Sequence, residues 1–142
     1  MRFMGLLRAD AESEAGAPPS PELMARMGTF LEDVTKAGVL LGTDGLHPSS
    51  RGARVRLANG KVTVTDGPFT ESKELVASYA LLQVKSKEEA IEWIKRSPNP
   101  FPGADAEIEI RQLFEAEDFG AELTPELRDR EERLRARLAA QQ

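Results

Sequence analysis

The chain has 142 residues, of which 40% are hydrophobic and 30% charged, and its formal net charge is −5. These values are typical of a single globular domain with its own buried core. The absence of cysteine excludes disulfides, thiolate nucleophiles and cysteine-ligated metals. A protein that binds a duplex needs a basic face to displace counterions from phosphates, so we expect no nucleic-acid partner.

The N-terminal third is predicted to be a strand, a loop and a helix. Residues 2–8 form an apolar run that is too short for a secretory leader or a membrane span, so we expect a cytoplasmic location and no membrane partner. Residues 11–20 are predicted to be a loop. Ser20 followed by Pro21 is typical of a helix start, and Gly38 is expected to end the helix. Its apolar stripe consists of Leu23, Met27, Phe30, Leu31 and Val34.

A β-hairpin is the clearest local pattern in the chain. Val39 begins a second predicted strand, which leads into a glycine-rich stretch at residues 42–45. Asn59-Gly60 is a preferred dipeptide of two-residue hairpin loops because both positions tolerate positive φ. The alternating residues around it predict the pairs Leu57–Val62 and Val55–Val64 on one face, and Arg56–Thr63 and Arg54–Thr65 on the other.

The remaining pattern predicts a strand, a helix and a strand. Residues 77–84 are apolar enough for a strand covered on both faces. Ser86 and Glu89 predict a capping box at the start of the next helix. Residues 106–114 alternate as in a half-exposed strand. The order predicts an α+β fold, ferredoxin-like βαββαβ with an inserted β-hairpin.

Two larger expectations follow from this order of elements. Helices on one side of the sheet leave its other face uncovered, and a second copy would cover it. We therefore expect a homodimer. Residues 1–119 are assigned to this domain, and residues 120–142 to a C-terminal charged helix. That helix is expected to pack a narrow leucine face on its own domain or on a partner subunit.

The turn Asp-Gly-Pro-Phe at residues 66–69 is called the DGPF turn below. Gly67 permits backbone angles that other residues avoid, and Pro68 fixes its own φ. Asp66 is expected to accept a hydrogen bond from the N–H of Phe69 or Thr70. One interpretation is a stiff corner between two strands. The other places Asp66 at the edge of a pocket as an acid, a base or an anchor, with Phe69 as a pocket wall.

His47 is the only histidine. It would act as a general base only beside a carboxylate, and Asp44 or Asp66 could supply one. The alternative is a loop histidine with one backbone hydrogen bond. A single histidine cannot build a histidine-rich metal site, and no cofactor motif is present. We therefore expect neither a metal nor a cofactor.

Two arginines of the hairpin are further candidates. Arg54 and Arg56 share a face and could bind a carboxylate or phosphate group bidentately. Alternatively, they are solvated or paired with the acidic residues that follow the DGPF turn. The charges of that segment are expected to be solvated turn residues: Glu71, Lys73 and Glu74.

The hairpin and the turn together resemble a known family. Asn-Gly-Lys-Val at residues 59–62 and Asp-Gly-Pro-Phe-Thr-Glu-Ser-Lys-Glu at residues 66–74 resemble the signature of the DGPF group within the YCII-related family. The resemblance extends from the first strand to Phe114. It implies a ferredoxin-like fold, a dimeric α+β barrel and a cleft between sheet and helices. Such proteins are often bacterial, and their biochemical function is mostly unassigned.

This chain departs from the pattern at one important position. YCII-type relatives carry a histidine early in the first long helix, where it is suggested to pair with an aspartate. The matching position here is Leu23, so the resemblance does not transfer that dyad. The catalytic residues are unknown, with Asp66 and His47 as candidates.

Three hypotheses for function remain open. In the first, the protein binds or acts on a small molecule in a cleft beside the DGPF turn, lined by Asp66, Phe69, His47 and Arg54, with Arg56 as a further ligand contact. In the second, it is a non-enzymatic dimeric accessory or regulatory protein, for example linked to a sigma factor or stress response. In the third, it is a structural dimer without retained chemistry.

Overall fold

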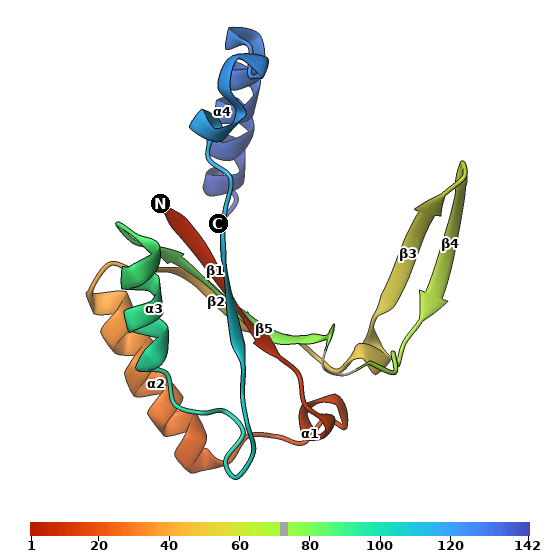
Figure 1. The fold of residues 1–142 in the computed structure, drawn as a ribbon, viewed down its shortest axis with the longest axis vertical. Coiled ribbons are helices and arrows are strands. Elements are labelled where there is room, and N and C mark those ends of the chain that lie inside the picture. Colours follow the sequence, from red (N-terminus) through yellow and green to blue (C-terminus); the bar gives the residue numbers. More distant parts are fainter. Residues whose placement is uncertain (72–73) are drawn as a thin grey trace. The chain divides into compact units, whose positions relative to one another are not determined.

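The computed structural model describes residues 1–71 and 74–142 (Figure 1). The predicted solvated charge Lys73 therefore lies outside the described residues. By its contacts the chain divides into two units, Met1–Gln112 and Leu113–Gln142. Each unit is described by itself below.

The first unit contains a four-stranded sheet with the order β2-β5-β1-β6. Its strands are β1 (Arg2–Arg8), β2 (Leu40–Gly45), β5 (Val76–Gln83) and β6 (Ile108–Gln112). β1 is antiparallel to both β5 and β6, and β2 is antiparallel to β5. An antiparallel sheet combined with helices confirms the predicted α+β class, and all four predicted strands are present within a few residues of their expected bounds.

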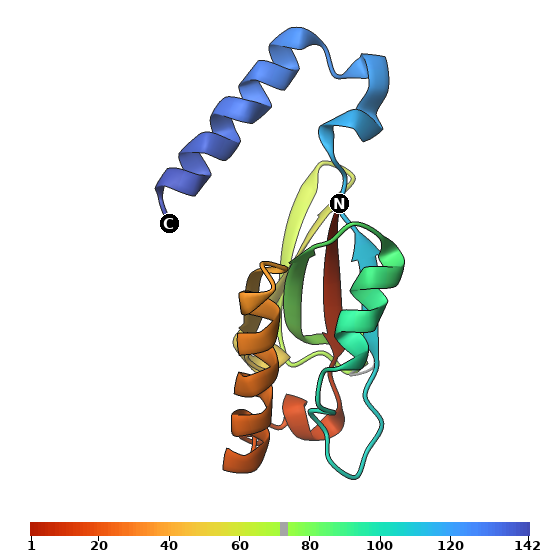
Figure 2. The same cartoon turned by 90° about the vertical axis from the view of Figure 1, so that its left-hand side faces the viewer.

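Two helices, α2 (Pro21–Lys36) and α3 (Lys87–Lys95), cover one face of this sheet (Figure 2). The Ser20 hydroxyl accepts the N–H of Leu23 at 3.1 Å, and Gly38 follows the helix with φ +72°, so both predicted helix ends are confirmed. The core between the helices and the sheet consists of the buried residues Phe3, Val34, Val39, Leu82, Val84 and Ala90. Burial of these apolar side chains fixes the helices on the sheet.

The predicted loop at residues 11–20 is wrong in its first part, which forms the short helix α1 (Ala11–Glu14). The Asp10 carboxylate accepts the N–H of Ser13 at 2.7 Å, and the Ser13 hydroxyl accepts the N–H of Asp10 at 2.9 Å. This capping box stabilises a single helical turn. A single turn is too short to show apolar periodicity, so the sequence pattern did not reveal it.

The predicted capping box of α3 is only half correct. The Ser86 hydroxyl accepts the N–H of Glu89 at 3.1 Å. The Glu89 carboxylate, however, accepts the N–H of Lys85 at 2.8 Å instead of that of Ser86. Both bonds satisfy backbone donors near the helix start, so the helix is still capped.

The strands β3 (Ala53–Ala58) and β4 (Lys61–Asp66) form a separate two-stranded sheet, called the arm below. The arm lies between β2 and β5 in sequence, as the predicted inserted hairpin does, and its register confirms all four predicted cross-strand pairs. Asn59 and Gly60 have φ of 52° and 71° at the loop. We call Val55, Leu57, Val62 and Val64 the apolar face of the arm.

The second unit contains a 3₁₀ segment, Ala116–Glu122, and the helix α4 (Pro125–Ala140). The Thr124 hydroxyl accepts the N–H of Leu127 at 3.3 Å and caps the start of α4. The rings of Phe114 and Phe119 lie 5.3 Å apart between centroids. Among the described residues, no helix is both long and apolar enough to cross a bilayer.

Among the described residues of the first unit, no helix covers the sheet face opposite α2 and α3 (Figure 1). The strand register places Met4 beside Leu81 and Leu6 beside Tyr79 on this side, which we call the free face. The Tyr79 hydroxyl donates to Asp44 Oδ2 at 3.0 Å. This hydrogen bond, together with the negative charge of Asp44, raises the pKa of Tyr79 above 10.0.

The sole tyrosine of the chain allows a direct test of this contact. In Asp44→Ala, the pKa of Tyr79 should fall toward 10.0, because the acceptor that favours the neutral phenol is removed. In the parent protein the neutral phenol stabilises the fold below the unfolded pKa, and this contribution is lost as pH rises through the higher folded pKa. The pKa of Tyr79 is measured in each protein by following the ultraviolet absorbance of the phenolate as pH rises. Asp105→Ala is the control, and identical titration curves for all three proteins would contradict the assignment.

Candidate functional site

The DGPF turn lies against a short 3₁₀ segment, Ser49–Arg51, at the base of the arm. The N–H of Gly67 donates to the carbonyl of Gly52 at 3.0 Å. A Cβ at Gly67 would overlap the carbonyl oxygen of Ser49. The glycine is therefore required by the close approach of two backbone segments, and not by a positive φ. The peptide bond between Gly67 and Pro68 is cis.

Ser49 joins three segments of the first unit at this base. Its N–H donates to Glu14 Oε1 at 3.0 Å, and its hydroxyl donates to Glu14 Oε2 at 2.5 Å. The same hydroxyl oxygen accepts the N–H of Phe69 at 3.0 Å. Of the two N–H groups expected to donate to Asp66, that of Phe69 therefore donates to the Ser49 hydroxyl instead. Neither Ser49 nor Glu14 was indicated by a sequence pattern.

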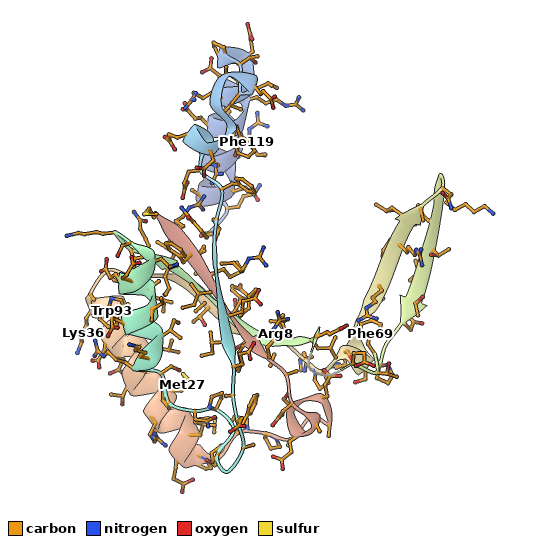
Figure 3. All side chains as sticks on the ribbon, in the orientation of Figure 1. Arg8, Met27, Lys36, Phe69, Trp93 and Phe119 are labelled. Atoms are coloured by element: carbon orange, nitrogen blue, oxygen red, sulfur yellow. The ribbon has the colours of Figure 1, made fainter. Side chains whose placement is uncertain are left out.

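Two of the predicted ligand-binding residues lie together at this corner. The Arg54 guanidinium carbon is 3.9 Å from the centroid of the Phe69 ring, which is the geometry of a cation–π contact. Figure 3 labels Phe69 beside the base of the arm. Arg56 is exposed on the same face of the hairpin, and Asp66 is an exposed residue paired with Ala53 at the end of the arm.

His47 is exposed and lies beside a cation. Arg51 Nη1 is 3.3 Å from His47 Nε2 and 3.4 Å from Nδ1. The Asp44 carboxylate, one of the two partners expected for it, instead accepts the hydroxyl of Tyr79. Among the described residues, no group of three His, Asp or Glu side chains could hold a metal ion.

A separate cavity of about 70 Å³ lies between the covered face of the sheet and the helices. Its lining is mostly apolar and includes the hydroxyl-bearing residues Thr43, Ser78 and Ser97. The Thr43 hydroxyl donates to the carbonyl of Tyr79 at 2.8 Å. We call this space the sheet–helix cavity; its lining consists of Gly5, Leu7, Met27, Phe30, Leu31, Thr43, Ser78, Tyr79, Ala80, Ile94, Ser97, Pro100 and Ile108. Figure 3 labels Met27 on α2.

Gly5 leaves space for the sheet–helix cavity. A Cβ at this position would lie 3.3 Å from Ile94 Cδ1 and 3.4 Å from Ile108 Cγ2, which is tight for both side chains. A glycine inside a strand often marks such a close approach, so Gly5 is a sequence signal from which this space could have been predicted. None of Asp66, Phe69, His47 and Arg54 lines this cavity, and the predicted cleft beside the DGPF turn stays a prediction.

Leu23 occupies the position where the resemblance implies a histidine in relatives. It is 7% exposed and lines an open hollow of about 270 Å³ with Asp10, Ser13 and Phe101 among others. A leucine side chain cannot transfer a proton. This position therefore supplies no acid or base to the hollow, although Asp10 and Glu12 are among its lining residues.

The model of the YCII-related domain matches residues 1–114 of this chain. The chain belongs to the YCII-related family. A relative from Rhizobium meliloti (strain 1021), named uncharacterized protein R00369, is 32% identical over 91 residues, which cover 64% of this chain and 73% of that protein. The family membership confirms the sequence resemblance and leaves the biochemical activity open.

The comparison with solved structures includes 5-chloro-2-hydroxyhydroquinone dehydrochlorinase from Burkholderia phenoliruptrix AC1100 in complex with 2,5-dihydroxybenzoquinone. The TM-score is 0.42 with 13% sequence identity, over 83% of this chain and 98% of that chain. No residue role is transferred from it to this YCII-related protein.

The close approach at Gly67 gives a stability prediction. Gly67→Ala should lower the free energy of unfolding by about 2 kcal/mol or more, because the new Cβ forces two backbone segments apart. Gly28→Ala in α2 is the matched control, since a Cβ there meets nothing within 4 Å and alanine is favoured in a helix interior by up to about 1 kcal/mol. Urea unfolding measures both. Equal stability of the two variants would contradict the described contact.

Proposed function

We propose that this YCII-related protein binds, or acts on, a small and mostly uncharged organic molecule in the sheet–helix cavity. The observation that carries the proposal is the lining of this space, which combines apolar side chains with a few hydroxyls and includes no charged residue. Ligand sites are commonly apolar hollows in which a few polar groups fix the orientation of the ligand. A ring-sized molecule bearing one or two hydroxyl groups matches that chemistry.

The size of the cavity limits the ligand. An engineered apolar cavity of about 150 Å³ holds benzene, and the sheet–helix cavity is about 70 Å³. A ring-sized ligand therefore requires a small outward shift of α2, the helix that contributes Met27, Phe30 and Leu31 to the lining. Gly5 supports the binding of a ring-sized ligand, because it leaves the β1 side of the cavity without a side chain at this position.

The corner at the DGPF turn lies outside the sheet–helix cavity and is proposed as a separate site for a ligand group with negative charge. Arg54 presents a guanidinium held over the Phe69 ring, and Arg56 lies on the same face of the arm. Asp66, which pairs with Ala53 at the end of the arm, is the proposed acid, base or anchor of this corner, with His47 as the alternative candidate. A guanidinium held by a ring loses less freedom when it binds a carboxylate or phosphate.

The finer parts of the predicted fold are also proposals. The strand order β2-β5-β1-β6, with a helix between β1 and β2 and another between β5 and β6, supports a ferredoxin-like plan. The uncovered apolar residues of the free face support a homodimer in which a second copy covers this face. A cytoplasmic location remains part of the same proposal.

Phenol is a suitable probe for the sheet–helix cavity because it combines a small ring with one hydroxyl. In the parent protein, we expect phenol to shift the backbone amide resonances of Thr43 and Ser78 in two-dimensional NMR. In Gly5→Ala, the dissociation constant should rise about tenfold, equivalent to about 1.4 kcal/mol, because the added methyl group reduces the space between Ile94 and Ile108.

Gly28→Ala is the matched control for this experiment, since it adds the same methyl group in α2, where it meets nothing within 4 Å. It should bind phenol as the parent protein does. Binding that is unchanged in Gly5→Ala, or resonance shifts confined to residues outside the cavity lining, would contradict the proposed ligand site.

The alternative proposal is a non-enzymatic dimeric accessory or regulatory protein that acts through its surfaces. One observation favours it: Leu127, Leu134 and Leu138 of α4 are 47%, 58% and 53% exposed. Exposed leucines on a charged helix are available for a partner chain. Deletion of residues 121–142 should then abolish binding of the partner chain. The dissociation constant for phenol should not change. Loss of phenol binding in the truncated chain would argue against a surface role for this helix.

A further inference from the structure

The apolar face of the arm is unusually exposed. Val55, Leu57, Val62 and Val64 are 62%, 77%, 66% and 64% exposed. All four lie on one side of the arm, because Val55 pairs with Val64 and Leu57 pairs with Val62. The opposite side carries Arg54, Arg56 and two threonines, as expected for a face in water. The sequence therefore gives this hairpin one face suited to burial, and the described residues of the first unit leave it exposed.

A two-stranded hairpin is at best marginally stable alone in water. The arm pairs with no other strand among the described residues, and every residue from 53 to 66 except Ala58 is exposed. Its base is nevertheless fixed by the contacts of Ser49 and Gly67. An arm that is anchored at one end and uncovered along its length is suited to reach another chain.

We propose that the apolar face of each arm packs on the free face of the sheet of a second copy, and that two copies exchange arms about a twofold axis. This inference rests on the homodimer part of the proposed function and not on the ligand part. It adds the surface that forms the dimer and the residues that hold it together.

The area of the apolar face favours an exchange of arms over direct contact between two arms. At the stated exposures, the four side chains present roughly 450 Å², within the range of the largest apolar patches on monomers. Two arms packed on each other would bury roughly 900 Å² in total, less than stable interfaces require. In an exchange of arms there are two contacts, and each buries roughly 450 Å² on the arm and a similar area on the partner sheet. The total is roughly 1,800 Å², which lies within the standard range for stable interfaces.

The receiving surface has suitable chemistry. The free face presents Met4, Leu6 and Leu81 at its centre, each half-buried in the single chain. Charged residues lie at its margin, where Arg8 Nη2 is 2.8 Å from Glu109 Oε1 and Arg111 Nη1 is 3.2 Å from Glu109 Oε2. An apolar centre with a polar rim is the usual anatomy of an interface between chains.

Neighbouring residues on β4 provide a matched pair of variants for a test with the full chain. Val62→Lys places a charge on the apolar face, and Thr63→Lys places the same charge on the opposite face. Sedimentation equilibrium should show a dimer for the parent protein and for Thr63→Lys. Val62→Lys should raise the dimer dissociation constant about a hundredfold, tenfold from each of the two equivalent sites in a twofold dimer.

Three results distinguish the claims. Circular dichroism of the sheet and helix signals should be the same in both variants, since neither side chain contributes to the core. A parent protein that stays monomeric at high concentration would overturn both the arm exchange and the homodimer. A dimer equally strong in Val62→Lys and Thr63→Lys would overturn the arm exchange alone, and neither result would affect the phenol titration.

The absence of cysteine allows the contact to be mapped. Leu57→Cys, labelled with a photoactivatable crosslinker, should attach to residues of β1 or β5 in the other copy when isotopically heavy and light chains are mixed. Arg56→Cys on the opposite face is the control and should give few such crosslinks. Crosslinks from Leu57→Cys only within one chain, or only between two arms, would overturn the proposed arrangement.

Discussion

The contact between Gly67 and the carbonyl of Ser49 determines where the arm begins and how the chain leaves it. Because no side chain intervenes, the DGPF turn lies directly against the segment that precedes β3. The Ser49 hydroxyl then links this turn to Glu14 of α1 through two further hydrogen bonds. The turn therefore connects the arm, which ends with β4, to the sheet of the first unit, which continues with β5.

The first unit thus combines two surfaces with different requirements. On the covered face of the sheet, buried residues such as Phe3 and Val34 hold the helices, while Gly5 leaves a small cavity among them. On the arm, apolar side chains remain in contact with water. The first arrangement suits a small ligand, and the second suits a large partner. Both uses fit one protein, since a ligand site and a dimer surface need not share residues.

The sequence allowed prediction of elements whose signals are local. The hairpin register followed from Asn59-Gly60 and strict alternation, and α2 followed from its cap and its apolar stripe. The contacts of Ser49 were not predictable, because they join segments far apart in the chain through one hydroxyl. The DGPF turn was recognised as unusual, but its glycine was explained by backbone angles when the real constraint is close approach. Exposure of the arm was equally hidden, since alternation predicts an apolar face without saying what covers it.

Hydrogen exchange measured by mass spectrometry at several protein concentrations tests the account most directly. Amides at the base of the arm, around Gly52, Gly67 and Phe69, should be protected at every concentration, because their bonds lie within one chain. Amides of β3 and β4 should become protected only as concentration rises and the arm is covered. Protection of the whole arm that does not depend on concentration, or a base that exchanges as fast as an unfolded chain, would contradict the account.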